Sequence, residues 1–126
     1  MLQHIAKRKS ITDFYRKHLK GIEGLIFLND INGVHHSYSY FPVIIDSKKY
    51  GKSRDTVYEE LKKHNIFTRR YFYPLISEFP VYRNLLSARK ENLPVAEKIA
   101  SQVLCLPIFP DLEFGVICEI TELLHK

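Results

Sequence analysis

The sequence predicts a small α/β domain in which helices pack against one sheet. Helical and strand patterns follow one another along the chain in the order α-β-β-α-β-α-β-α. A length of 126 residues corresponds to about one domain, and a hydrophobic content of 45% is enough for a core at this size. No internal repeat, linker or low-complexity segment divides the chain, so we expect residues 1–126 to form a single domain.

The first half of the chain predicts one helix and two strands. Residues 2–20 place apolar side chains near one stripe, with lysines and arginines between them. The stripe consists of Leu2, Ile5, Ile11, Tyr15 and Leu19. Residues 25–28 form a short strand candidate. Residues 37–46 alternate at first and then become continuously apolar, as in a strand that enters a core, and Pro42 favours an edge position or a bulge in it.

The middle of the chain predicts a helix, a strand and a long connection. Ser53 is a suitable N-cap for a helix that runs to about Lys63. Residues 66–70 are the next strand candidate. Residues 74–94 hold three prolines and little periodicity, which indicates an ordered loop or a short helix.

The last third predicts helix, strand and helix. Pro94 is suited to the first turn of a helix, and its expected buried face consists of Val95, Ala96, Ile99 and Ala100. Residues 103–106 form a short strand that ends at Pro107. Asp111 is the expected cap of the last helix, whose inward residues are Val116, Ile117, Ile120, Leu123 and Leu124.

Composition narrows the class of protein. The net charge of +5 is spread over separated basic pairs rather than one block, so it gives weak support to nucleic-acid binding, and we expect no nucleic-acid partner. The two cysteines lie in apolar surroundings, which favours buried free thiols in a reducing compartment. The histidines show no metal-ligand spacing. No apolar run reaches membrane-spanning length, so we expect no membrane partner and a cytoplasmic location.

Residues 65–77 are the most informative stretch. They begin like a buried strand, continue into two arginines and three aromatic residues, and meet a proline. Guanidinium groups beside tyrosines suit a phosphorylated or carboxylated small molecule. The alternative is an edge strand with aromatics in the core and solvated arginines.

One candidate ligand surface follows from the residues alone. Tyr38 and Tyr40 are two positions apart, so on one strand they would share a sheet face. If that strand neighbours residues 66–70, they would line one wall with Arg69, Arg70, Tyr71 and Tyr73. The alternative is that this face is core. No phosphate loop, nucleophile elbow or acid/base pair stands out, so we assign no catalytic residue.

Several motifs in order resemble the DegT/DnrJ/EryC1/StrS sugar aminotransferases, in the form of transaminases of dTDP-linked sugars. The motifs are Ala6-Lys7-Arg8 with Tyr15–Leu19, Ser37–Pro42, Thr68–Leu75, Phe79–Tyr82, Leu93–Ala100 and Val103–Pro110. The resemblance implies the small C-terminal domain of a fold type I enzyme, an α/β (α+β) unit with a small, mostly antiparallel sheet. It also implies that residues 2–20 are the linker helix from a missing N-terminal cofactor domain.

The resemblance further implies a chemistry that this chain does not hold alone. Family enzymes use pyridoxal 5'-phosphate, bound by a lysine of the cofactor domain, to aminate nucleotide-linked keto sugars. No lysine here matches that position, so we expect an inactive chain that binds no cofactor. The histidine that follows Pro-Leu in many relatives is replaced by Ile76. This departure leaves the sugar preference open.

Two functions remain open at this point. In the first, the chain is the C-terminal part of a nucleotide-sugar aminotransferase, with substrate contacts from Arg69, Tyr71, Tyr38, Tyr40, Arg70 and Tyr73. In the second, it is a stand-alone module that binds sugar nucleotides or a partner. A C-terminal part without its cofactor domain should leave apolar surface uncovered, so we expect self-association into a homo-oligomer through the first helix.

Overall fold

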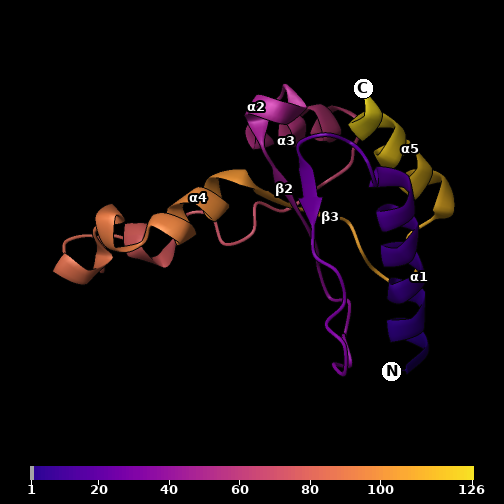
Figure 1. The fold of residues 1–126 in the computed structure, drawn as a ribbon, viewed down its shortest axis with the longest axis horizontal. Helices are drawn as coiled ribbons and strands as arrows, with labels where there is room; N and C mark the ends of the chain where they lie inside the picture. The colour runs from indigo at the N-terminus through magenta and orange to yellow at the C-terminus, as the bar shows by residue number, and fades with distance from the viewer. Residues whose placement is uncertain (1) are drawn as a thin grey trace.

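The computed structural model describes residues 2–126 and confirms the predicted α/β class. Helices and one small sheet alternate along the chain (Figure 1). The α-helices and strands are α1 (Leu2–Leu19), β1 (Leu25–Phe27), β2 (Phe41–Ile45), α2 (Ser47–Tyr50), α3 (Arg54–Lys63), α4 (Pro94–Gln102), β3 (Val103–Leu106) and α5 (Phe114–His125). None of the helices within residues 2–126 is long and apolar enough to cross a membrane.

The sheet has three antiparallel strands in the order β1-β2-β3. Strand β2 is central, which differs from the edge position that Pro42 predicted. The register explains how proline is tolerated there. Strand β1 ends at Phe27, opposite Val43, so Pro42 lies beyond it and is paired only with Cys105 of β3. At Pro42 the central strand therefore has a hydrogen-bonding partner on one side only. Proline, which has no backbone N–H, is tolerated at such an edge-like position.

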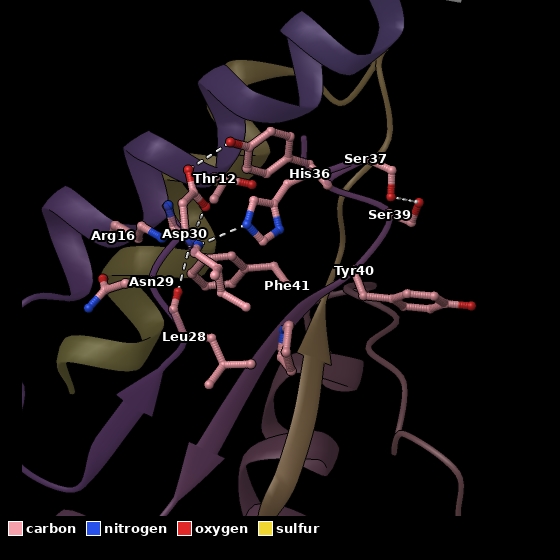
Figure 2. A pocket seen from close by; sticks show the side chains of 13 residues that line it. Thr12, Arg16, Leu28, Asn29, Asp30, His36, Ser37, Ser39, Tyr40 and Phe41 are labelled. Carbon is pink, nitrogen blue, oxygen red and sulfur yellow. Dashed lines mark hydrogen bonds and ion pairs between the residues drawn. The ribbon is translucent and has the colours of Figure 1, made fainter. Parts of the chain in front are cut away.

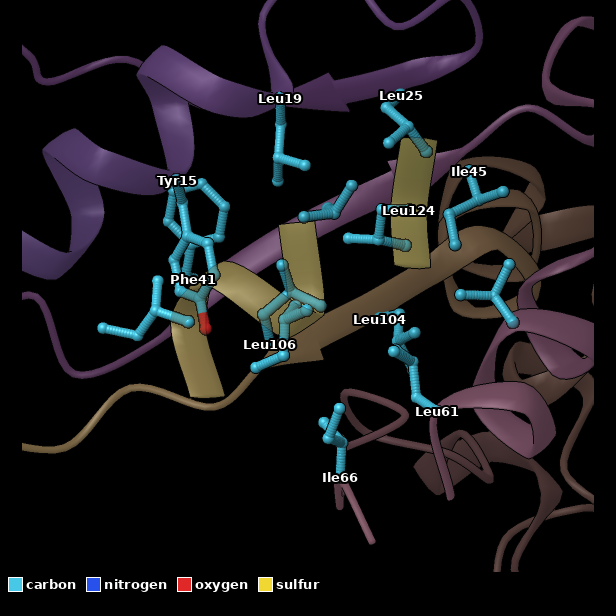
Figure 3. Close-up of a cluster of buried hydrophobic side chains, with 14 of the residues drawn as sticks. Tyr15, Leu19, Leu25, Phe41, Ile45, Leu61, Ile66, Leu104, Leu106 and Leu124 are labelled. Atoms are coloured by element: carbon cyan, nitrogen blue, oxygen red, sulfur yellow. The ribbon is translucent and has the colours of Figure 1, made fainter. Parts of the chain in front are cut away.

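The core lies between the sheet and helices α1, α3 and α5 (Figure 3). Strand β2 alternates, with Phe41, Val43 and Ile45 buried, whereas all four residues of β3 are buried. Helices α1 and α5 lie side by side (Figure 1). Helix α5 turns Ile117, Ile120 and Leu124 inward, as predicted. Its predicted cap is wrong, because the helix begins three residues after Asp111 and Glu113 takes the N-cap position.

Helix α1 packs through residues spaced four apart. Ile11, Tyr15 and Leu19 are buried, and this spacing places them on one face. The Tyr15 ring stacks on Phe41 with centroids 5.0 Å apart, and its hydroxyl donates a hydrogen bond of 3.0 Å to the Pro107 carbonyl. The predicted stripe is wrong at its start, because Leu2 is 80% exposed.

Helix α3 begins as the sequence indicates. The Ser53 hydroxyl oxygen accepts a hydrogen bond from the Thr56 backbone N–H at 3.1 Å, which satisfies one of the free donors of the first turn. Val57 and Leu61 are buried on its inner face. Arg54 is buried as well, a position that the apolar pattern could not predict.

The chain after α3 departs from the predicted strand. Residues 66–70 form no strand with β3, only an isolated β-bridge between Arg69 and Cys105. The backbone turns on both sides of this segment. Asn65 and Phe72 have φ values of 58° and 47°, in the left-handed region that interrupts extended pairing.

The long connection extends away from the body as an arm, defined here as residues 74–93 (Figure 1). It contains three short 3₁₀ turns, Ile76–Glu78, Leu86–Ala88 and Lys90–Asn92, in agreement with the predicted ordered loop. Helix α4 follows it and buries only Ala100, so the prediction that Val95 is buried is wrong. The arm carries exposed large apolar residues: Ile76, Phe79, Val81, Tyr82, Leu85 and Leu86.

Candidate functional site

The predicted ligand residues lie on the segment that leaves α3 and on the loop before β2. The segment 66–73 is held to β3 by two backbone hydrogen bonds. Arg69 N donates to Cys105 O at 3.0 Å, and Cys105 N donates to Arg69 O at 2.8 Å. This bridge places Arg69 beside the residues that follow β3.

Arg69 and Tyr40 line a common open cavity of about 420 Å³, here called the Arg69 cavity. Its wall consists of Ser39, Tyr40, Phe67, Arg69 and residues 105–109. Phe67 and Phe109 are 68% and 49% exposed, so aromatic faces are available to a ligand. Within residues 2–126 no ion pair or hydrogen bond engages the Arg69 guanidinium. A free guanidinium beside exposed rings suits a planar or anionic ligand group.

Tyr71 does not line this cavity itself but packs against Tyr40, which does. Its ring centroid lies 5.2 Å from that of Tyr40 and 4.1 Å from that of Phe72. Such offset aromatic arrangements are favourable beyond the burial of their area. Tyr40 and Tyr71 therefore form one surface, although the two segments are not the neighbouring strands that the sequence predicted.

Arg70 and Tyr73 face the other way, toward α3. The Arg70 guanidinium carbon lies 4.8 Å from the ring centroid of Tyr58 and 4.7 Å from that of Tyr73. Its Nη1 is also 3.5 Å from Asp55 Oδ1. These two predicted site residues are thus separated from Arg69 by the backbone between them.

Tyr38 lies in a different cavity, of about 310 Å³, between α1 and the loop before β2 (Figure 2). Its hydroxyl donates a hydrogen bond of 2.7 Å to Asp30 Oδ2, and Arg16 Nη2 donates one of 2.8 Å to Asp30 Oδ1. The hydrogen bond from Arg16, followed by that from Tyr38, lowers the pKa of Asp30 to about 2.

The expectation that Tyr38 and Tyr40 share a sheet face is wrong. Both precede β2, and Tyr38 has a φ of 50°, which breaks the alternation of an extended strand. In Figure 2 the Tyr40 side chain points away from Asp30, whereas the Tyr38 hydroxyl is hydrogen-bonded to Asp30. Tyr40 lines both cavities from the edge between them.

Several residues of these cavities escaped the sequence reasoning. Phe67 and Phe109 reach the Arg69 cavity from segments 42 positions apart. An ion pair joins Arg16 of α1 to Asp30 in the loop after β1, and Thr12 is buried in the same cavity. The turn-rich stretch that contains Asp30 was visible in the sequence, but its ion-pair partner on α1 was not.

The comparisons with known proteins decide the family. The profile of the DegT/DnrJ/EryC1/StrS aminotransferase family matches residues 1–125. The chain belongs to this family. Two curated relatives carry the name dTDP-4-amino-4,6-dideoxy-D-glucose transaminase. The one from Escherichia coli is 52% identical over 95% of this chain and 32% of its own length. The one from Shigella dysenteriae is 38% identical over 82% and 28%.

Solved structures give the same result for the fold of this DegT/DnrJ/EryC1/StrS chain. The structure of DesI in the presence of its TDP-sugar product superposes with a TM-score of 0.86 and 30% identity, over 96% of this chain and 30% of that one. The structure of S. venezuelae DesV in complex with a ketimine intermediate has a TM-score of 0.81 and 25% identity, and the match covers 95% of this chain and 30% of that one. The chain therefore spans about a third of the length of the relatives it matches.

Family membership makes pyridoxal 5'-phosphate the relevant cofactor, and the Arg69 cavity does not fit it. A pyridoxal-phosphate site needs a lysine for the aldehyde and an acidic partner for the ring nitrogen. Within the described residues, the wall of the Arg69 cavity contains neither a lysine nor a carboxylate. Its donor set instead offers one guanidinium, hydroxyl groups and aromatic rings.

Proposed function

We propose that this chain is the C-terminal part of a nucleotide-sugar aminotransferase, the part that contacts the sugar nucleotide. The activity would transfer an amino group to a nucleotide-linked keto-deoxysugar. The carrying observation is the Arg69 cavity, where an unpaired guanidinium stands beside Tyr40, and Tyr71 extends the aromatic surface. Family membership and the names of the curated relatives support the substrate class.

Each group in the cavity has a role that its chemistry supports. Arg69 would bind a phosphate or another anionic group through charge-assisted hydrogen bonds. Tyr40 and Tyr71 would stack on a ring or donate hydroxyl hydrogen bonds to the sugar. Arg70 and Tyr73 face α3 and would act on the ligand indirectly, while Tyr38 is held by Asp30 in the neighbouring cavity.

The 126-residue chain would not catalyse transamination alone. The cofactor would be bound by an N-terminal cofactor domain, joined through α1, because the Arg69 cavity lacks a lysine and an acidic partner. That domain, and a second copy of the protein in a homo-oligomer, would also cover apolar surface. Much of this surface lies on the arm, and on α1 it is confined to the first turn at Leu2. We propose a cytoplasmic location for the complete enzyme.

A chimera tests this function directly. The matching region of the Escherichia coli relative is replaced by residues 1–126, and transamination of dTDP-4-amino-4,6-dideoxy-D-glucose is followed with and without Arg69→Ala. We expect an active chimera, a raised KM in the variant, and neither activity nor an aldimine absorbance band from the chain alone. A stoichiometric aldimine in the isolated chain would refute the proposal.

A stand-alone sugar-nucleotide-binding module is the second candidate. One observation favours it: residues of this chain by themselves bring Tyr40, Phe67 and Arg69 to one open cavity. Titration of a dTDP-sugar into the isolated chain separates the two functions. Saturable binding that Arg69→Ala abolishes would support an independent module. If the calorimetric titration shows no heat of binding at millimolar ligand, the result would favour the C-terminal part of an aminotransferase.

A further inference from the structure

Arg70 is enclosed by aromatic rings on the surface of α3. Its guanidinium carbon lies within 5 Å of the ring centroids of both Tyr58 and Tyr73, so the cation is stacked between two electron-rich faces. Asp55 Oδ1 lies 3.5 Å from Arg70 Nη1. Tyr58 and Asp55 belong to α3, and both are therefore fixed to the body of the domain.

Asp55 is itself oriented by a buried neighbour. The Arg54 Nε lies 2.8 Å from Asp55 Oδ1, and the Arg54 side chain is 3% exposed. Arg54 Nη1 donates hydrogen bonds to the carbonyls of Ala100 at 2.9 Å and Val103 at 3.2 Å, at the junction of α4 and β3. One carboxylate thus connects a buried arginine to the partly exposed Arg70.

The direction of Arg70 determines the direction of its neighbours. Successive side chains of an extended segment point to opposite sides. With Arg70 directed toward α3, Arg69 is directed to the opposite side, where it lines the Arg69 cavity. Arg70 also begins a turn in which Tyr73 N donates a hydrogen bond of 3.3 Å to Arg70 O, and this turn brings the Tyr71 ring to 5.2 Å from that of Tyr40. Phe72, with a φ of 47°, is the second central residue of this turn.

We infer that Tyr58 and Asp55 are positioning residues for the Arg69 cavity: they hold Arg70 so that Arg69 and Tyr71 face the ligand. The inference rests on the proposed function for its consequence in catalysis. Neither residue lines the cavity, so their effect on a substrate passes through Arg70. The simpler alternative is a surface cluster that adds a little stability and leaves the cavity unchanged.

Four variants separate these alternatives. Tyr58→Leu removes the stacking face, and Tyr58→Phe retains it without the hydroxyl. Asp55→Asn removes the charge that Arg70 meets. Glu59→Gln is the matched control, because it removes one carboxylate from an exposed position of the same helix.

Two measurements are made on each variant. In the isolated 126-residue chain with labelled tyrosines, the nuclear Overhauser effect between the Tyr40 and Tyr71 rings reports their approach. In the chimera with the Escherichia coli cofactor domain, KM and kcat show whether a variant weakens substrate binding in the Arg69 cavity or slows turnover. We expect Tyr58→Leu to lose the ring contact and to raise KM about tenfold with little change in kcat. Asp55→Asn should produce a smaller change in the same direction, while Tyr58→Phe and Glu59→Gln should match the wild type.

The outcomes are distinguishable. A ring contact and a KM that both persist in Tyr58→Leu and Asp55→Asn would overturn the inference. If the ring contact is lost and KM is unchanged, the positioning holds but the proposed role of the Arg69 cavity in substrate binding fails. If Tyr58→Leu does not fold, Asp55→Asn and Arg70→Lys provide the same comparison, since lysine keeps the charge of Arg70 but not its planar stacking.

Discussion

Arg69 and Cys105 are joined by a reciprocal pair of backbone hydrogen bonds, although they lie on segments 36 positions apart. The bridge belongs to the backbone of Arg69, whereas the proposed ligand contact belongs to its side chain. The two roles of this residue can therefore be tested separately.

Two substitutions at Arg69 should have opposite signatures. Arg69→Ala retains the bridge and removes the guanidinium, so the free energy of unfolding should change by no more than about 0.5 kcal/mol. KM of the chimera should rise about ten- to a hundredfold, the range for loss of a hydrogen bond to a charged group. Arg69→Pro removes the N–H that bonds Cys105 and should destabilise the chain by about 1 kcal/mol or more. Urea unfolding and steady-state kinetics measure both effects, and a destabilised Arg69→Ala chain would contradict the separation.

Leu104 should be among the most sensitive positions for stability. It lies on β3 and is fully buried in the core cluster. Leu104→Ala should lower the free energy of unfolding by about 2–5 kcal/mol, because it removes buried methyl groups and leaves a cavity. Leu86→Ala on the arm is the control, since Leu86 is 71% exposed and its effect should stay within about 0.5 kcal/mol. Equal effects of the two variants in urea unfolding would refute the assigned core.

Asp30 should contribute to the acid sensitivity of the fold. Its pKa falls from an ordinary 3.8 to about 2 through the hydrogen bonds from Arg16 and Tyr38. Because its pKa is lower in the folded state, the Asp30 carboxylate contributes fully to the free energy of unfolding above about pH 4. As the pH falls, the unfolded state takes up a proton first and this contribution declines. It is gone below about pH 2. Asp30→Asn should therefore be less stable than the wild type at pH 7. The difference should vanish near pH 2, as measured by denaturant unfolding at low salt.

The two thiols should differ in reactivity. Burial raises the pKa of the Cys105 thiol to about 11, against a smaller opposing effect of Arg69, and the residue is 4% exposed. Cys118 is only partly buried. At pH 8 a disulfide reagent should modify Cys118 first and Cys105 only on unfolding, because the thiolate is the reactive form. Cys118→Ser should abolish the fast phase. A fast phase that survives in that variant would show that Cys105 is accessible.

Elements with a strong local signal were predictable from the sequence. The part of the α1 stripe from Ile11 to Leu19, the Ser53 cap and the apolar run of β3 each depend on neighbouring residues, and the structure confirms them. The strand predicted at residues 66–70 failed because its apolar and β-branched composition says nothing about the turns at Asn65 and Phe72. A local pattern cannot report where a strand loses its partner.

The candidate site was predictable only in part, for a similar reason. The tyrosines and arginines were recognised as a cluster by type. Tyr40 and Arg69 do line one cavity, and the Tyr71 ring lies beside that of Tyr40. Their distribution over two sides of the segment depends on Tyr58 and Asp55, which the sequence shows only as ordinary helix residues. The role of these residues in substrate binding stays a prediction until the variants above are measured.

The buried Arg54 has a consequence for how this domain can change over evolution. It touches the chain where the arm departs, with its guanidinium 5.3 Å from the Tyr73 ring centroid, and where α4 returns it, at Ala100 and Val103. Both ends of the excursion are thus fixed to one side chain of the body. The entropic cost of closing a loop rises only slowly with its length. The arm can therefore be lengthened, shortened or replaced by another sequence while the core stays intact. A change confined to this segment would therefore alter the exposed apolar surface of the arm without disturbing the core.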